Sequence, residues 1–196
     1  MKIILASSNQ HKATEISAML PQNIQVCLQG DLGIDSAPET GLAFVENALI
    51  KARHASYQAN MPAIADDSGL CVAALEDRPG IISARYAGPG ASDQANIKKL
   101  LEELDGKQNR DAFFYCVMVF LESAENAIPL IAEASWHGKI SLAPSGKSGF
   151  GYDPVFYVPE LGLTAAEISA PQKNKLSHRA LALNLLKRKL FDQYPT

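Results

Sequence analysis

Residues 111–122 read DAFFYCVMVFLE, a run rich in aromatic and β-branched side chains. Side chains of these types are enriched in strands, so the run predicts a buried β-strand. The stretch IPLIAEASWHGKISLA at 128–143 follows after a short connection and also has strand character. We therefore expect the two stretches to pair as an antiparallel hairpin near the centre of a sheet.

Outside this hairpin the chain alternates between strand and helix patterns. Short apolar runs predict strands at 2–6 (KIILA), 24–28 (IQVCL) and 63–65 (AIA). Apolar residues at helical spacing predict helices at 7–20, 40–60, 92–104 and 176–191. Polar or glycine-rich sequence predicts loops at 29–39 and 77–91, and a loop that turns into a strand at 144–158.

Strands alternating with helices around an antiparallel pair indicate an α/β fold, with a mixed β-sheet flanked by helices. A length of 196 residues is that of one domain, or of one domain with two lobes. We expect a mixed sheet of this length to form two lobes with a cleft between them. Ligands of such sheets gather near the carboxyl ends of strands.

Charge and cysteine content exclude several classes of protein. A formal net charge of −3 argues against a surface that coats nucleic acid, although it allows a local basic pocket for one phosphorylated small molecule. The three cysteines are far apart and form no CxxC or Cys/His cluster, so we expect reduced core thiols in a cytoplasmic protein. The sequence contains no pattern typical of a signal peptide or a membrane span.

Polar stretches fall where several predicted strands end. After the first strand, Ser7, Ser8 and Asn9 can donate hydrogen bonds, and the start of the next helix offers free N–H groups to an anion. Lys12 lies in the first helical turn, where a cation opposes the helix dipole unless it reaches back to a phosphate. An ordinary capped helix with a solvated lysine explains the same stretch.

Two further stretches allow more than one interpretation. GKS at 146–148 is not a phosphate-binding P-loop, because that motif requires glycine where Ser141 stands and should open a helix. In SGFGYDP at 148–154, two glycines free the backbone around Phe150, which could stack on a base or fill a hairpin corner of the core.

Taken together, the chain resembles the inosine triphosphate pyrophosphatase family, enzymes that act on non-standard purine nucleoside triphosphates. The matching stretches occur in family order over nearly the whole chain. They are ASSNQHK (6–12), ETG…FVENALIKA (39–52), AIADDSGL (63–70), PGIISARYAG (79–88), GFGYDPVF (149–156) and KNKLSHRALAL (173–183).

The resemblance implies a fold and a reaction. The family fold is an elongated mixed α/β structure with two lobes and a central nucleotide-binding cleft, usually as a homodimer. Its members hydrolyse inosine, deoxyinosine or xanthosine triphosphate to the monophosphate and pyrophosphate, with Mg²⁺ as cofactor. Residues 1–196 would then be one pyrophosphatase domain that removes deaminated purines from the nucleotide pool, without binding nucleic acid or membranes.

The resemblance also implies a set of site residues. Asp67 would be the proton acceptor, and Asp67 and Glu39 would contact Mg²⁺. The residues expected to bind the nucleotide are Ser7, Ser8, Asn9, Gln10, His11, Lys12, Lys51, Ser68, Phe150, Gly151, Tyr152, Asp153, Lys173, His178 and Arg179. Because strand side chains alternate, Asp66 should not share the pocket of Asp67 unless the chain bends, so we expect it to support the turn or an outer metal shell.

Two alternatives stay open. The septum-formation inhibitor type of nucleotide pyrophosphatase has a related fold but opens with a pattern resembling ASxSxRR, where this chain has ASSNQHK. A nucleotide-binding module without catalysis would not need Glu39, Asp67 and the two lysines together. Ser7 and Ser8 replace the Thr-Gly or Thr-Asn of many relatives and Tyr152 replaces a frequent Trp, which leaves the fine substrate preference open.

Overall fold

The structure, a computed structural model, describes residues 2–7, 9, 14, 16–17, 19–20 and 24–193. The strands are β1 (Lys2–Leu5), β2 (Gln25–Leu28), β3 (Ala63–Val72), β4 (Asp111–Leu121), β5 (Leu130–Ile140), β6 (Phe156–Val158) and β7 (Leu163–Thr164). The helices are α2 (Phe44–Ala59), α3 (Asp93–Glu103), α4 (Ala170–Leu176) and α5 (His178–Gln193), with single 3₁₀ segments η1 (Gln29–Leu32), η2 (Ala73–Leu75) and η3 (Gly80–Arg85).

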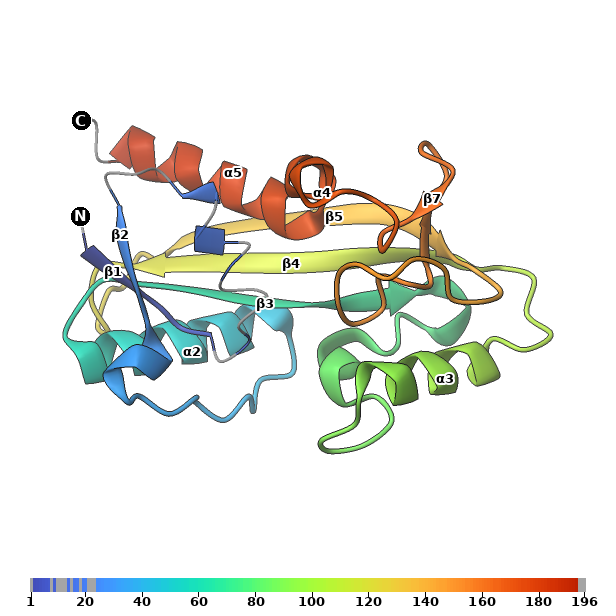
Figure 1. The fold of residues 1–196 in the computed structure, drawn as a ribbon. Coiled ribbons are helices and arrows are strands. Elements are labelled where there is room, and N and C mark those ends of the chain that lie inside the picture. Colours follow the sequence, from blue (N-terminus) through green and yellow to red (C-terminus); the bar gives the residue numbers. More distant parts are fainter. Residues whose placement is uncertain are drawn as a thin grey trace. The chain divides into compact units, whose positions relative to one another are not determined.

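The strands form one seven-stranded sheet in the order β2-β1-β3-β4-β5-β6-β7 (Figure 1). Strand β1 pairs in parallel with both β2 and β3, whereas β5–β6 and β6–β7 are antiparallel pairs. The predicted α/β fold with a mixed, helix-flanked sheet is therefore confirmed. The predicted hairpin strands are β4 and β5, which are neighbours in the sheet.

The chain divides into two compact units. Unit 1 comprises Met1–Asp67, Cys116–Ala134 and Arg179–Thr196, and unit 2 comprises Ser68–Tyr115 and Ser135–His178. Strands β3, β4 and β5 each contribute residues to both units. The cleft predicted between two lobes stays a prediction.

In unit 1, helices α2 and α5 cover opposite faces of the sheet (Figure 1). Ile3 and Leu5 of β1 and Met118 of β4 belong to the same buried cluster as Leu183 and Leu186 of α5. Side chains alternate along a strand, so the residues between these positions face the α2 side. There α2 presents a fully buried stripe of small side chains, which lets its backbone approach the sheet: Ala48, Ala52 and Ala55.

In unit 2, aromatic side chains of β4, β5 and β6 form the centre of the buried core. The Phe114 ring lies 4.6 Å from the Phe156 ring, and the Trp136 ring lies 5.1 Å from Phe156. Leu100 and Leu104, from α3 and its C-cap, complete this cluster. Ser92 caps α3, because its side chain accepts a hydrogen bond from the Ala95 N–H group.

Strand β3 corrects one prediction. The sequence placed the end of this strand at residue 65, because aspartate is depleted in strands. The strand instead runs from Ala63 to Val72, and Asp66 and Asp67 lie inside it, both buried. Asp67 receives a cation from α2, the helix before the strand, and Asp66 receives one from α5 near the end of the chain, and these tertiary contacts outweigh the local preference.

Helix α2 corrects another boundary, since it begins at Phe44 rather than at residue 40. The Glu46 carboxylate accepts hydrogen bonds from the N–H groups of Leu42 and Ala43, and Asn47 Oδ1 accepts one from the Gly41 N–H group. These bonds satisfy N–H groups of the residues before the helix, and the backbone of the N-cap residue Ala43 is extended. A Cβ at Gly41 would come within 2.6 Å of Glu46 Cβ, so the close approach requires glycine.

Other predictions had mixed outcomes. The helix predicted at 7–20 falls mostly outside the described residues. Short helix α4 and strand β7 were not predicted, and Ser177 separates α4 from α5, so the last helix begins at His178. All three cysteines are free, as expected, and Cys71 and Cys116 are buried, whereas Cys27 is partly exposed and is not a core residue. Within the described ranges, no helix is both long and apolar enough to cross a membrane.

Replacing Gly138 of β5 with alanine should destabilise the protein. A Cβ there would come within 2.5 Å of the Tyr157 carbonyl oxygen and 2.7 Å of the Phe156 ring. We expect Gly138→Ala to lower the free energy of unfolding by about 1–3 kcal/mol, measured by urea denaturation. Gly30→Ala is the control, because a Cβ at Gly30 meets nothing within 4 Å. Equal stabilities of the two variants would contradict this packing.

Candidate active site

Lys51 of α2 joins two carboxylates in unit 1. Its Nζ atom lies 2.9 Å from Glu39 Oε1 and 3.0 Å from Asp67 Oδ1. Asp67 is 6% exposed, and the Lys51 side chain is 12% exposed. The structure thus brings together three of the predicted site residues, two of them expected to contact Mg²⁺.

The electrostatics around Lys51 favour its charged form. Burial on its own lowers the pKa of this ammonium group, but the carboxylates of Asp66, Asp67 and Glu39 outweigh burial, and the net result is a raised pKa. Lys51 is therefore a permanent cation at neutral pH. A fixed positive charge next to an acidic strand suits the binding of a polyanion such as a triphosphate.

Asn47 holds the other oxygen of Asp67. It lies one helical turn before Lys51, so both side chains share a face of α2. Asn47 is fully buried, and its Nδ2 atom donates to Asp67 Oδ2 over 3.3 Å while its Oδ1 atom accepts from Gly41. Both oxygens of Asp67 thus have donors on α2. The sequence analysis gave Asn47 no role, although its i,i+4 spacing from Lys51 was a usable signal.

Asp66 has a different partner, as strand alternation predicts. Its Oδ2 atom lies 3.5 Å from Nε of Arg179, near the start of α5. Both residues are almost completely buried, at 1% and 2% exposed. Asp66 therefore anchors the first turn of α5 to β3. Whether Arg179 also reads the edge of a base stays a prediction.

A second polar cluster lies in unit 2. Lys173 of α4 donates to Asp153 Oδ2 over 2.7 Å, and both residues are buried. The same oxygen accepts a hydrogen bond from the Phe150 N–H group over 2.9 Å. Lys173 Nζ also lies 5.0 Å from the centre of the Phe150 ring, a cation–π geometry. Three residues predicted to recognise the base are thus in contact with one another.

His178 and Tyr152 are fixed by their own contacts in unit 2. The His178 imidazole stacks on Phe114, with ring centres 4.7 Å apart and planes inclined by 12°. The Tyr152 hydroxyl donates to the Ser83 carbonyl oxygen over 2.9 Å. Burial raises the pKa of Tyr152, with further contributions from Tyr86 and Asp93, so the phenol stays a hydrogen-bond donor at neutral pH.

The remaining predicted residues divide into two groups. Ser7 Oγ accepts a hydrogen bond from the Asn9 N–H group, a local turn after β1, and Ser68 is half-buried in β3. The Gly151 N–H group donates to Asp93 of α3. Four predicted phosphate-binding residues lie outside the described residues: Ser8, Gln10, His11 and Lys12. Their roles stay predictions.

The two carboxylates around Lys51 could serve as the protein ligands of a magnesium ion. Glu39 and Asp67 point one oxygen each at the same cationic atom, so the two carboxylates already converge. Within the described part of the chain, no group of three or more His, Cys, Asp or Glu side chains could hold a metal. Mg²⁺ commonly uses one or two protein carboxylates and takes its other oxygens from water and substrate phosphates.

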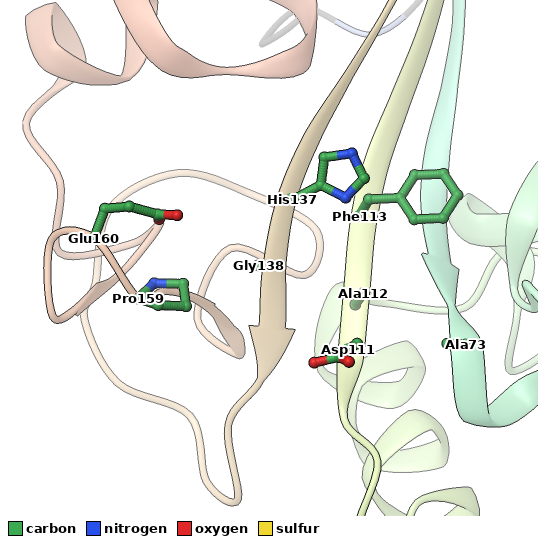
Figure 2. A pocket seen from close by; sticks show the side chains of 8 residues that line it. All are labelled: Ala73, Asp111, Ala112, Phe113, His137, Gly138, Pro159 and Glu160. Carbon is green, nitrogen blue, oxygen red and sulfur yellow. The ribbon is translucent and has the colours of Figure 1, made fainter.

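A pocket of about 300 Å³ in unit 2 is a poor candidate for this site. Figure 2 shows the Phe113 and His137 side chains next to each other on neighbouring strands, and their ring centres lie 5.5 Å apart. Carboxylates of Asp111 and Glu160 also line the pocket and would repel a triphosphate. None of the lining residues belongs to the predicted site: Ala73, Asp111, Ala112, Phe113, His137, Gly138, Pro159 and Glu160.

Comparison with known proteins places the chain in a family. The model of the Ham1 family matches residues 3–189. The chain belongs to the Ham1 family. It is 56% identical to the dITP/XTP pyrophosphatase of Halorhodospira halophila, over 95% of each chain. It is 51% identical to the enzyme of the same name from Nitrosomonas europaea, over 97% of this chain and 95% of the relative.

A solved Ham1-family structure agrees with the fold. The HAM1 protein of Coxiella burnetii superimposes with a TM-score of 0.92 at 45% identity, and the match covers 98% of this chain and 99% of that one. The family resemblance seen in the sequence motifs is therefore confirmed, and so is the mixed α/β fold with helices flanking the sheet.

Removal of the Lys51 charge should destabilise the folded protein. Lys51→Met leaves the buried Asp67 carboxylate without its cation, so we expect the free energy of unfolding to fall by about 3 kcal/mol. Lys98→Met is the matched control, because the Lys98–Glu102 pair on α3 is 77% and 64% exposed and contributes at most about 0.5 kcal/mol. Urea denaturation without added metal measures both. A loss for Lys51→Met no larger than for the control would contradict this assignment.

Proposed function

We propose that this protein hydrolyses non-standard purine nucleoside triphosphates, the inosine, deoxyinosine and xanthosine forms, to the monophosphate and pyrophosphate. The observation that carries the proposal is the cluster in which Lys51 joins Glu39 and Asp67. It combines a fixed cation with two convergent carboxylates, as hydrolysis of a metal-bound triphosphate requires. Family membership and the names of the relatives support the same reaction.

The residues of unit 1 would act on the triphosphate. When bound, Mg²⁺ would supply a Lewis acid that polarises phosphate oxygens, and Glu39 and Asp67 would hold it. Asp67 would orient the attacking water and accept its proton, since its carboxylate is kept in place by Lys51 and Asn47. Lys51, together with the predicted Lys12, would neutralise phosphate charge.

The residues of unit 2 would recognise the purine. Phe150 would stack on the base, and Asp153, Lys173 and His178 would meet its edge. Hypoxanthine and xanthine carry a 6-oxo acceptor, whereas adenine carries a donor at that position. Buried donors that suit the oxo group are left unpaired by adenine, and such a mismatch can reduce kcat/KM by up to about 10⁴-fold.

The product of a nucleotide panel tests this proposal. We expect the protein, supplied with Mg²⁺, to release pyrophosphate from inosine and xanthosine triphosphates with far higher kcat/KM than from adenosine triphosphate. Asp67→Asn keeps the side-chain shape but loses the charge and the proton acceptor, so kcat should fall by about 10²-fold or more. Phosphate release measured with and without inorganic pyrophosphatase identifies the product.

Other outcomes of the panel would favour other functions. Preference for modified pyrimidine nucleotides would indicate the septum-formation inhibitor type of enzyme. Orthophosphate as the first product would indicate cleavage at the terminal phosphate. Nucleotide binding without turnover would indicate a binding module. Full turnover of Asp67→Asn with unchanged Mg²⁺ demand would remove Asp67 from the mechanism.

Arg179 should contribute to the choice of base. We expect Arg179→Ala to lower the ratio of kcat/KM for inosine over adenosine triphosphate by about tenfold or more, because a donor to the 6-oxo group is lost. Arg179→Lys keeps a cation beside Asp66, so we expect it to destabilise the fold less than Arg179→Ala, and it serves as the second variant. Arg188→Ala, at an exposed position of the same helix, is the control. An unchanged ratio in both Arg179 variants would remove Arg179 from base recognition.

Three further features belong to the same proposal. Residues 1–196 would act as one pyrophosphatase domain made of both units. The carboxylate pair and the family resemblance both support a requirement for Mg²⁺. A homodimer in the cytoplasm, where nucleotide pools are maintained, is implied by that resemblance alone.

A further inference from the structure

The stretch PGIISARYAG at 79–88 matches the family, but the proposed function gives it no task. In the structure, this stretch and the first turn of α3 both form hydrogen bonds with residues 149–153, which we call the GFGYD loop. This loop carries Phe150 and Asp153, two of the residues proposed to recognise the base. The contacts lie within unit 2.

The GFGYD loop has a tight internal conformation. Gly149 adopts a φ of +79°, and a Cβ there would collide with the Asp153 carboxylate. Asp153 Oδ2 in turn accepts from the Phe150 N–H group over 2.9 Å. Gly151 also has a positive φ, of +61°. The position of the Phe150 ring therefore depends on the backbone on both sides of it.

Asp93 holds this loop from one side. Its Oδ2 atom accepts a hydrogen bond over 2.6 Å from the N–H group of Gly151, the residue directly after Phe150. Asp93 is the first residue of α3, and the Ser92 cap fixes that end of the helix. The carboxylate is therefore presented by a rigid element, and a hydrogen bond to a charged acceptor is stronger than a neutral one.

Tyr152 holds the loop from a second side. Its side chain is 4% exposed, and its hydroxyl donates to the carbonyl oxygen of Ser83 over 2.9 Å. Ser83 Oγ accepts from the Leu70 N–H group over 2.9 Å and donates to the Gly80 carbonyl oxygen over 2.6 Å. A chain of buried hydrogen bonds thus joins β3, the 79–88 stretch and the GFGYD loop.

Helix α3 connects the two anchors. Buried Asn96 accepts from the Ala87 N–H group over 2.8 Å and donates to the Ala84 carbonyl oxygen over 3.2 Å. Lys99 donates to the Tyr86 carbonyl oxygen over 2.7 Å. The helix that presents Asp93 therefore also holds the stretch that receives the Tyr152 hydroxyl.

We propose that Asp93 and Tyr152 are positioning residues for base selectivity, which hold the GFGYD loop so that Phe150 and Asp153 meet the purine in one fixed geometry. This inference rests on the proposed function. Tyr152, which the family resemblance places among the nucleotide-binding residues, then acts through its buried hydroxyl and ring. A displacement of about 1 Å in a recognition group is enough to reduce discrimination strongly, so loss of either anchor acts on selectivity.

The test separates positioning of the base from general stability. Asp93→Ala and Tyr152→Phe are assayed with inosine triphosphate, adenosine triphosphate and ribose 5′-triphosphate, which has no base. Each variant should lower kcat/KM for inosine triphosphate by about three- to tenfold, the size of one hydrogen bond, mainly through KM. The ratio of inosine to adenosine triphosphate should fall as well. Cleavage of ribose 5′-triphosphate should stay within about twofold of the wild type.

Matched variants complete the design. Asp93→Asn keeps an acceptor for the Gly151 N–H group and should restore most of the selectivity lost in Asp93→Ala. Asp105→Ala, just beyond the end of α3, and Tyr157→Phe in β6 change the same residue types outside the site and should leave all three substrates unchanged. The Tm of each variant is measured alongside. Asp93 is exposed, so Asp93→Ala should fold even if Tyr152→Phe is destabilised.

The outcomes are distinguishable. Unchanged selectivity in both variants, with a wild type that prefers inosine triphosphate, overturns this inference and leaves the proposed function standing. An equal loss on ribose 5′-triphosphate also overturns it, because the anchors would then support the whole fold. A wild type without preference for inosine triphosphate overturns the proposed function and this inference together.

Discussion

Two adjacent carboxylates are buried inside strand β3, at 1% and 6% exposed, and the surrounding structure must supply cations for both. Asp66 forms an ion pair with the Arg179 guanidinium of α5, and Asp67 forms one with the Lys51 ammonium group of α2. A buried charge without a partner is strongly destabilising, so these pairs fix the placement of both helices against the strand. Because neighbouring side chains of a strand point in opposite directions, one strand can accept helices on both faces.

The same constraint gives unit 1 the arrangement of charges that the proposed binding of a metal-bound triphosphate needs. Glu39 joins Asp67 on Lys51, and Asn47 occupies the second oxygen of Asp67. The carboxylates therefore converge before any ligand arrives. A group that is held by two donors from one helix loses little freedom when it orients a water or a metal, which is the physical advantage of preorganisation.

Unit 2 contains a second set of polar contacts, an ion pair and two hydrogen bonds, which hold the GFGYD loop. The loop is held by the Asp153–Lys173 ion pair, by the Asp93 carboxylate and by the Tyr152 hydroxyl, and the Tyr152 ring belongs to the buried core of this unit. These contacts join motifs that are far apart in the sequence.

The sequence by itself determined the class of fold and most of its elements. The spacing of apolar residues and the residue types predicted β1, β2, β4, β5, α3 and α5, because the strand and helix preferences of those segments agree with their burial. Motif order identified the family. The convergence of Glu39, Lys51 and Asp67 was expected only through that resemblance, since no local pattern shows which distant side chains meet.

Tertiary structure decided the rest. Strand β3 continues through Asp66 and Asp67 against local preference, because Lys51 and Arg179 arrive from other elements. Helix α2 starts late, because Glu46 and Asn47 bind the backbone before it. The anchoring of the GFGYD loop by Asp93 and Ser83 was invisible in the sequence. Ion pairs and hydrogen bonds between residues far apart in the chain have no local signature, and only the folded chain brings their partners within reach.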